Sequence, residues 1–343
     1  MRTLLLLLIG VRVAVATPVA PPLRAIDSPS PIEIRIGPDK NADAPRGLPK
    51  AFRATQRILD DFRRSESRRF LLLTDLSDKE AAVHLQLLER SAHAVEDFRS
   101  RLSLSTAGRN VDRKMLAVAF SSRADFLWFA RQQDGLDADW MSGYFAPISG
   151  RLVYYHAQDL PGIQRAVRTL EQRGNQREAL ASLASFLSKS TAAVVVHEAV
   201  HMILHEEGIM PANSSIPLWL AEGIAASFEP VVASRSFGPF KRENGRTQSF
   251  QEDLESDQAP PLQVLVGSLS LPGGGEDAVR SFYDASAALC SWLARVKPDA
   301  MARFIQACCL GSAGHDRTSR IEAFELHVGP IGEIEAMWLS EYR

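Results

Sequence analysis

Short apolar runs and amphipathic segments divide the chain into a mixed N-terminal part and a helical C-terminal part. Apolar runs at residues 69–75 and 114–122 predict two buried strands. Residues 142–156 predict a strand, a turn at 147–150 and a second strand, and the alternating residues 32–36 predict one further short strand. All the predicted strands therefore lie in the first half of the chain.

Segments with apolar residues at helical spacing predict the remaining elements. The predicted helices cover residues 51–64, 78–101, 123–133, 190–208, 216–228, 277–296, 298–309, 318–327 and 331–342, with further helical segments up to Lys189. Ser190 or Thr191 can cap the helix over 190–208, and Gly208 suits the left-handed position at its end. The three valines at 194–196 favour a strand, but the length of the apolar run favours a helix. Strands followed by helices predict an α+β fold with a mixed sheet.

The first residues have the features of a secretory signal peptide. Arg2 precedes an apolar run over residues 4–11, and Ala14 and Ala16 form a cleavage pattern of small residues. The alternative is an uncleaved membrane anchor, but Arg12 makes the apolar run short for a membrane span. We therefore predict a secreted or periplasmic protein with no stable membrane span after cleavage.

The chain divides into four segments on these patterns. Residues 1–16 are the predicted signal peptide, 17–50 a Pro-rich linker or arm, 51–208 an α/β lobe, and 209–343 a mostly helical lobe. The composition, 45% hydrophobic and 23% charged, is typical of a globular protein with a sizeable core. The formal net charge of -2 gives no electrostatic signature of a nucleic-acid-binding protein, so we expect no such partner.

The three cysteines do not form a disulfide framework or a metal-binding pair. In an oxidising compartment Cys290 could pair with Cys308 or Cys309, which would leave one thiol over. The alternative is that all three are buried free thiols on C-terminal helices.

Two histidines and a glutamate interrupt the apolar helix predicted over residues 190–208. His197-Glu198-x-x-His201 is an H-E-x-x-H pattern, and residues four apart lie on one face of a helix. Two imidazoles placed in this way can bind one Zn²⁺. The neighbours are Val, Ala, Met, Ile and Leu, among which these polar side chains are costly unless they are paired or bind a metal. The pattern predicts a metal site, against the alternative of histidines that bind nothing.

Glu222 is the best candidate for the third protein ligand that catalytic zinc commonly has. It is the one ionisable residue in the apolar run from 218 to 226, and a buried carboxylate needs a partner such as a cation. The alternative is that Glu222 lines a surface face. Gly223 costs about 1 kcal/mol inside a helix relative to Ala, which suggests that another backbone approaches closely. His205 lies too far along the first helix, and we expect it at the exposed end.

The combination of H-E-x-x-H at 197–201 with W-L-x-E-G-x-A at 219–225 resembles the gluzincins, the zinc metallopeptidases that include thermolysin and the aminopeptidase-type enzymes. A weaker resemblance over residues 69–296, in segments such as RFLLLTD and FYDASAALCSWL, is to secreted bacterial proteins of the peptidase-MA-like type. The resemblance implies a zincin-like fold. It also implies that the zinc ligands are His197, His201 and Glu222 and that the general base is Glu198.

By the same resemblance, Tyr283 would stabilise the oxyanion of the reaction; the alternative is an aromatic side chain packed in the core. Two features of the family are missing. The G-x-M-E-N motif, whose Glu holds a substrate's free amine in the aminopeptidases, is absent upstream of the zinc helix. The Asp that thermolysin has four residues after its third ligand is Ala226 here, so a His ligand needs another partner, for which Glu229 is a candidate.

These residues predict a secreted zinc-dependent metallopeptidase that hydrolyses peptide bonds in a peptide or protein substrate. Glu198 would take a proton from a water molecule held by the zinc and pass it to the leaving amine. By analogy, the substrate would lie along the strand at 142–146 or the strand at 151–156. One alternative is a zincin-fold binding or scaffold protein that retains zinc without cleaving peptides. Another is a structural protein in which the pattern is accidental.

Overall fold

The computed structural model describes residues 34–36, 48–49, 51–105, 113–136, 141–156, 176–211, 214–232, 235–241 and 244–343. The predicted signal peptide, most of the predicted arm over 17–50 and the helical segments predicted between 157 and 175 lie outside these residues. The described residues form a six-stranded sheet and 11 helices, which confirms the α+β class.

The sheet has the strand order β1-β2-β3-β4-β6-β5. Its strands are β1 (Arg35–Ile36), β2 (Arg63–Glu66), β3 (Phe70–Thr74), β4 (Met115–Phe120), β5 (Gly143–Ala146) and β6 (Arg151–Tyr155). The central strands β3, β4 and β6 run parallel and are buried along their whole length, as expected for strands covered on both faces. The strands predicted at 69–75, 114–122 and 142–156 are confirmed, with β5 at one edge of the sheet.

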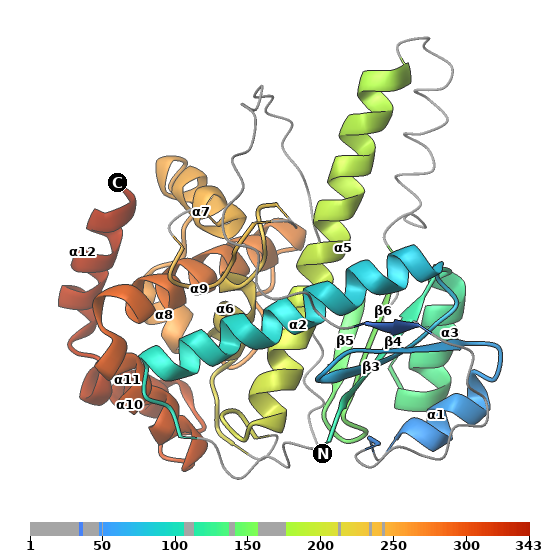
Figure 1. Cartoon of the computed structure of the whole chain (residues 1–343). Helices are drawn as coiled ribbons and strands as arrows, with labels where there is room; N and C mark the ends of the chain where they lie inside the picture. Colours follow the sequence, from blue (N-terminus) through green and yellow to red (C-terminus); the bar gives the residue numbers. More distant parts are fainter. Residues whose placement is uncertain are drawn as a thin grey trace.

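Helices cover both faces of the sheet (Figure 1). On one face, Phe70 and Leu72 of β3 share a core with α2 (Asp78–Arg101) and α5 (Gln176–Glu206). On the other, Leu71 and Leu73 share a core with α1 (Phe52–Ile58) and α3 (Arg123–Asp134). This division follows from strand geometry, because successive side chains point to opposite faces. On this face α2 packs on β2 and β3, α5 packs on β5 and β6, and the two helices contact each other.

The two N-terminal helices differ in how well the pattern predicted them. α2 has the predicted bounds, and its first turn is closed by a capping box in which Ser77 and Glu80 bond each other's backbone N–H. The prediction of a helix over 51–64 is wrong in its second half, because α1 ends at Ile58 and Arg63–Glu66 form β2. The polar β2 carries no strand pattern of its own and is held by antiparallel pairing with β3.

α5 is longer than predicted. It begins at Gln176, so the predicted cap at Ser190 or Thr191 is wrong, and both side chains are buried within the helix. Its end is as predicted: the helix stops at Glu206, and Gly208 has a φ of 70°. Neither α5 nor any other helix of the described residues is long and apolar enough to cross a membrane.

The chain beyond residue 209 forms helices, as predicted. They are α6 (Leu218–Ser227), α7 (Gly245–Glu255), α8 (Leu262–Val266), α9 (Glu276–Val296), α10 (Pro298–Cys309), α11 (Arg317–His327) and α12 (Ile331–Tyr342). Of these, α7 and α8 were not predicted. Trp219 of α6 stacks on Phe304 of α10 and meets Phe324 of α11 edge-on, and α6 also packs along α9. These contacts fix α6, the helix that faces α5, to the C-terminal helices.

The three cysteines are free thiols in the structure, with Cys290 and Cys308 buried. Burial raises the pKa of Cys308 to about 12, so its thiol stays protonated at neutral pH. Of the two alternatives left open by the sequence, the structure shows the free thiols.

Candidate metal centre

The two histidines of the H-E-x-x-H pattern lie one turn apart on α5 and face the same way. His201 Nε2 is 3.2 Å from His197 Nε2, and the ring centroids are 5.0 Å apart. His197 is fully buried, and His201 is half-buried. The apolar residues around them, from Val194 to Leu204, pack into the core between the sheet and the C-terminal helices. The helix thus presents two imidazole nitrogens to a single point inside the molecule.

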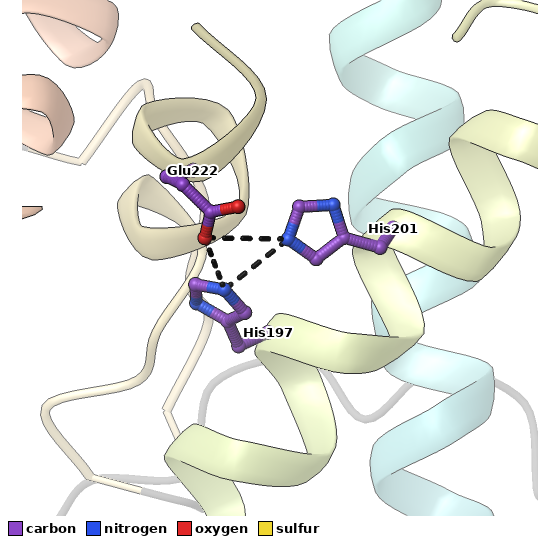
Figure 2. A group of neighbouring side chains, drawn as sticks. All are labelled: His197, His201 and Glu222. Atoms are coloured by element: carbon purple, nitrogen blue, oxygen red, sulfur yellow. Dashed lines mark hydrogen bonds and ion pairs between the residues drawn. The ribbon is translucent and has the colours of Figure 1, made fainter. Parts of the chain in front are cut away.

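Glu222 completes the group from a second helix. Figure 2 shows His197 and His201 of α5 and Glu222 of α6 pointing toward one another. Glu222 Oε2 lies 3.3 Å from His197 Nε2 and 3.8 Å from His201 Nε2. One ligand atom from each of the three residues lies within 4.8 Å of the others, and no other described group of three or more metal-ligating side chains meets this condition. The three residues predicted as ligands are therefore together, and they could hold a metal ion.

A close helix crossing places Glu222. α6 starts after Pro217, and its residues are buried on every side. A Cβ atom on Gly223 would lie 2.5 Å from the carbonyl oxygen of Ser286 and 2.7 Å from Cys290 Sγ, both on α9. The predicted close approach of another backbone to Gly223 is therefore confirmed. Because α6 is in backbone contact with α9, the neighbouring Glu222 can face α5.

Charge and hydrogen bonding suit this cluster to a cation. Burial alone would lower the pKa of His197, but its contacts with Glu222 and Glu229 outweigh burial and raise the pKa to about 10. Burial would raise the pKa of Glu222, but His197 and His201 lower it to about 2. Oε1 of Glu222 is buried and has no hydrogen-bond partner among the described residues. Two imidazole nitrogens and a carboxylate with a spare buried oxygen fit a transition-metal ion.

Glu198 is buried beside these three candidate ligands. Neither of its carboxylate oxygens has a hydrogen-bond partner among the described residues. Burial raises the pKa of Glu198, and the nearby Glu222 adds to the effect, while His197, His201 and the backbone of Phe145 oppose it. A buried carboxylate without hydrogen bonds is costly, and such groups are concentrated at functional sites. Its position and its open oxygens allow Glu198 to act on a molecule bound at the metal site.

Glu229 contacts the outer nitrogen of His197. Its Oε1 lies 2.9 Å from His197 Nδ1, so the candidate partner named from the sequence is confirmed. Arg246 of α7 holds the same carboxylate, with Nε 2.9 Å from Oε2 and Nη2 3.1 Å from Oε1. Arg246 also donates to Asp284 of α9. A carboxylate on the outer nitrogen of a ligand His fixes the ring and its tautomer.

Arg246 and Asp284 were not predicted from the sequence. Asp284 could have been found from the sequence, because it is the one acidic or basic residue in the run from 281 to 294. That is the same feature that singled out Glu222. Arg246 carried no such signal, because it lies among polar residues in a helix that the pattern did not predict.

Tyr283 and His205 take different positions relative to the three candidate ligands. The buried ring of Tyr283 has its centroid 6.3 Å from that of His197, so α9 brings Tyr283 next to the site. The ring of His205 lies 5.3 Å from that of Phe145 on β5, outside the three-residue group and half-buried. The expectation that His205 takes no part in the metal site agrees with this placement.

Comparison with known protein families gives a match to part of the chain. Residues 191–310 match a family model described as "Protein of unknown function (DUF1570)". The match covers about a third of the chain and includes His197, Glu198, His201, Glu222 and Tyr283. No curated protein matches the chain. The matched segment thus contains the three candidate ligands, Glu198 and Tyr283, and the description of the family gives no activity for them.

Proposed function

We propose that this protein is a zinc-dependent metallopeptidase of the gluzincin type, with His197, His201 and Glu222 as the zinc ligands. The observation that carries the proposal is the convergence of these three donor groups beside Glu198, whose buried oxygens have no partner among the described residues. Two His nitrogens and one carboxylate are a ligand set of catalytic zinc sites, which keep a fourth position open.

Glu198 is the proposed general base. Bound zinc would supply Lewis-acid chemistry, polarising a peptide carbonyl and making water a better nucleophile near neutral pH. Glu198 accepts the proton of the attacking water and passes it to the departing amine nitrogen. A base of this kind is tuned by burial, and burial raises the pKa of Glu198 above the ordinary range.

Tyr283 is the proposed stabiliser of the oxyanion. Its buried ring lies next to His197, on the helix against which α6 packs. A phenol hydroxyl that donates a hydrogen bond to the oxygen of the attacked carbonyl stabilises the charge that develops there. The role therefore requires the hydroxyl, and an aromatic ring alone would not supply it.

The proposed substrate is a peptide segment that lies along β5. Of the two strands considered from the sequence, β6 is inside the sheet between β4 and β5, whereas β5 is the edge strand. An extended peptide can add to an edge strand through main-chain hydrogen bonds. β5 packs against α5, and Val194 of α5 would lie 2.8 Å from a Cβ atom on Gly143. This contact supports β5 as the substrate strand, because it keeps β5 beside the zinc helix. The predicted signal peptide supports a secreted or periplasmic location for the reaction.

The rival proposal is a zincin-fold scaffold that retains a metal without cleaving peptides. The chain lacks an Asp four residues after Glu222, which would favour such a scaffold, but Glu229 contacts His197 instead. A scaffold also has no need of a buried base such as Glu198. Both observations favour the peptidase.

Cleavage of an unfolded protein substrate tests the proposal. We expect the purified chain to cleave reduced, denatured casein. The cleavage should cease when a zinc chelator is added and return when zinc is restored. The Glu198→Gln variant should keep its zinc and lose cleavage. Glu206→Gln, at the last residue of the same helix, is the matched control and should cleave normally. Undiminished cleavage by Glu198→Gln would exclude the proposed mechanism, and zinc binding without any cleavage would favour the scaffold.

A further inference from the structure

A chain of ion pairs leads from His197 away from the metal site. Oε1 of Glu229 accepts a hydrogen bond from the N–H of His197 Nδ1. Both oxygens of the same carboxylate also accept hydrogen bonds from Arg246, whose planar guanidinium presents two N–H donors side by side. The side chains of Glu229 and Arg246 are only 10% and 11% exposed. Arginine forks of this kind fix the plane of a carboxylate as well as its distance. The orientation of Glu229 is therefore set by Arg246.

Arg246 is in turn fixed from the other side. Its Nη1 lies 3.2 Å from Oδ1 of Asp284, a residue that is 1% exposed on α9. Asp284 Oδ2 accepts from Arg280 at 2.9 Å, and Arg280 pairs with Asp253 of α7 at 2.8 Å. Arg280, which joins Asp284 to Asp253, is 29% exposed, so it is the most exposed member of this chain of ion pairs. Because Glu229 and Asp284 hold the guanidinium from two sides, the fork of Arg246 has one well-defined position.

We propose that Arg246, held by Asp284, is a positioning residue of the metal centre. It holds Glu229 so that Oε1 receives the N–H of His197 Nδ1, which leaves Nε2 as the nitrogen that faces His201 and Glu222. Arg246 also lies over the ring of Tyr283, 5.7 Å from its centroid. One side chain thus links the partner of a metal ligand to the proposed oxyanion residue. The inference rests on the proposed metal site and extends it to a helix that contributes no ligand.

The geometry distinguishes positioning from simple charge balance. A lysine at position 246 would supply a positive charge but only one point of contact, whereas the observed fork makes two contacts with Glu229 and one with Asp284. If Arg246 acted only by its charge, Arg246→Lys would be equivalent to the wild type. If it acts by geometry, Arg246→Lys should fall between the wild type and Arg246→Met.

The zinc dissociation constant of the purified full chain tests the inference. It is measured by competition with a chromophoric chelator, after circular dichroism has shown that each metal-free variant is folded. Loss of the partner of a ligand His weakens metal binding about 10–100-fold. We expect a weakening of that size for Arg246→Met and a smaller one for Arg246→Lys. Arg280→Met, which removes the partly exposed arginine on the other side of Asp284 from Arg246, is the matched control and should change the constant less than about fivefold.

A double-mutant cycle shows whether Arg246 acts through Glu229. Residues that act as one unit are non-additive, so Arg246→Met should weaken zinc binding little further in a Glu229→Gln background. Wild-type affinity in Arg246→Met or in Arg246→Lys, additive effects, or an equal loss in Arg280→Met would overturn the inference. A wild-type chain that binds no zinc would instead overturn the proposed function, on which the inference depends, so the two failures are told apart.

Discussion

The crossing of α6 and α9 at Gly223 gives a quantitative prediction about how the fold supports the site. In Gly223→Ala, the new methyl group would lie 2.5 Å from the carbonyl oxygen of Ser286, 2.7 Å from its carbonyl carbon and 2.7 Å from Cys290 Sγ. An ordinary contact is at least 3.4 Å, so α6 and α9 must separate by about 0.9 Å at this point. Two of the three atoms belong to the backbone and cannot turn away.

The free energy of this change has two opposing parts. Alanine favours a helix by about 1 kcal/mol relative to glycine. Overpacking of a well-packed core costs about 1–3 kcal/mol, and backbone contacts place Gly223→Ala near the upper end of that range. We therefore expect the free energy of unfolding to fall by about 2 kcal/mol. The affinity of the site for zinc should fall as well, because Gly223 is next to Glu222. Ligand distances in metal sites hold to within about 0.2 Å, so a displacement of Glu222 should weaken zinc binding at least about tenfold.

Urea unfolding of the metal-free protein and a chelator competition for zinc measure the two effects. The control is Gly332→Ala in the first turn of α12, where a Cβ atom would meet nothing within 4 Å. That variant should be as stable as the wild type or more stable, and it should bind zinc with the wild-type constant. If Gly223→Ala matched Gly332→Ala in both measurements, the close crossing would not be what positions Glu222.

Two further predictions concern single side chains. Tyr283→Phe keeps the ring beside His197 but removes the hydroxyl, so kcat for peptide cleavage should fall about 10²-fold or more while the zinc dissociation constant stays unchanged; an unchanged kcat would leave Tyr283 as a packing residue. The second concerns His84, whose Nδ1 lies 3.2 Å from the hydroxyl of Tyr154. Burial, with the nearby His156, lowers the pKa of His84 to about 3, so below pH ~6.5 the unfolded chain binds a proton that the folded chain does not. From pH 6.5 to pH 5 the free energy of unfolding should therefore fall by about 1.6 kcal/mol more for the wild type than for His84→Gln, and equal slopes in urea titrations would contradict this assignment.

The core elements of the fold could be predicted because their patterns are local. β3 and β4 are continuous apolar runs, and α2 has both a capping box and a buried stripe, so each is specified by its own residues. β2 could not be predicted, because its polar residues form a strand only through pairing with β3. The start of α5 was also missed. Ser190 and Thr191 are residue types that often cap a helix, but here both lie inside α5, which begins at Gln176, and both side chains are buried.

The three residues of the candidate metal site could be predicted because each is an ionisable residue in an apolar run. His197, His201 and Glu222 stand out for this reason, and the structure brings them together. Glu229 was a weaker candidate, since it follows the apolar run of α6, yet it contacts His197. The role of Arg246 depends on how α7 packs against α9, and no local pattern reports that packing.

The metal content of the purified protein tests the central claim most directly. The full chain is dialysed against buffer that contains a small excess of zinc and then against zinc-free buffer, and its metal is counted by mass spectrometry. We predict one zinc per wild-type chain and a large loss of zinc in Glu222→Gln, with both proteins folded by circular dichroism. A folded wild-type chain that retains no zinc, or a Glu222→Gln variant that retains as much as the wild type, would contradict the proposed three-ligand zinc site.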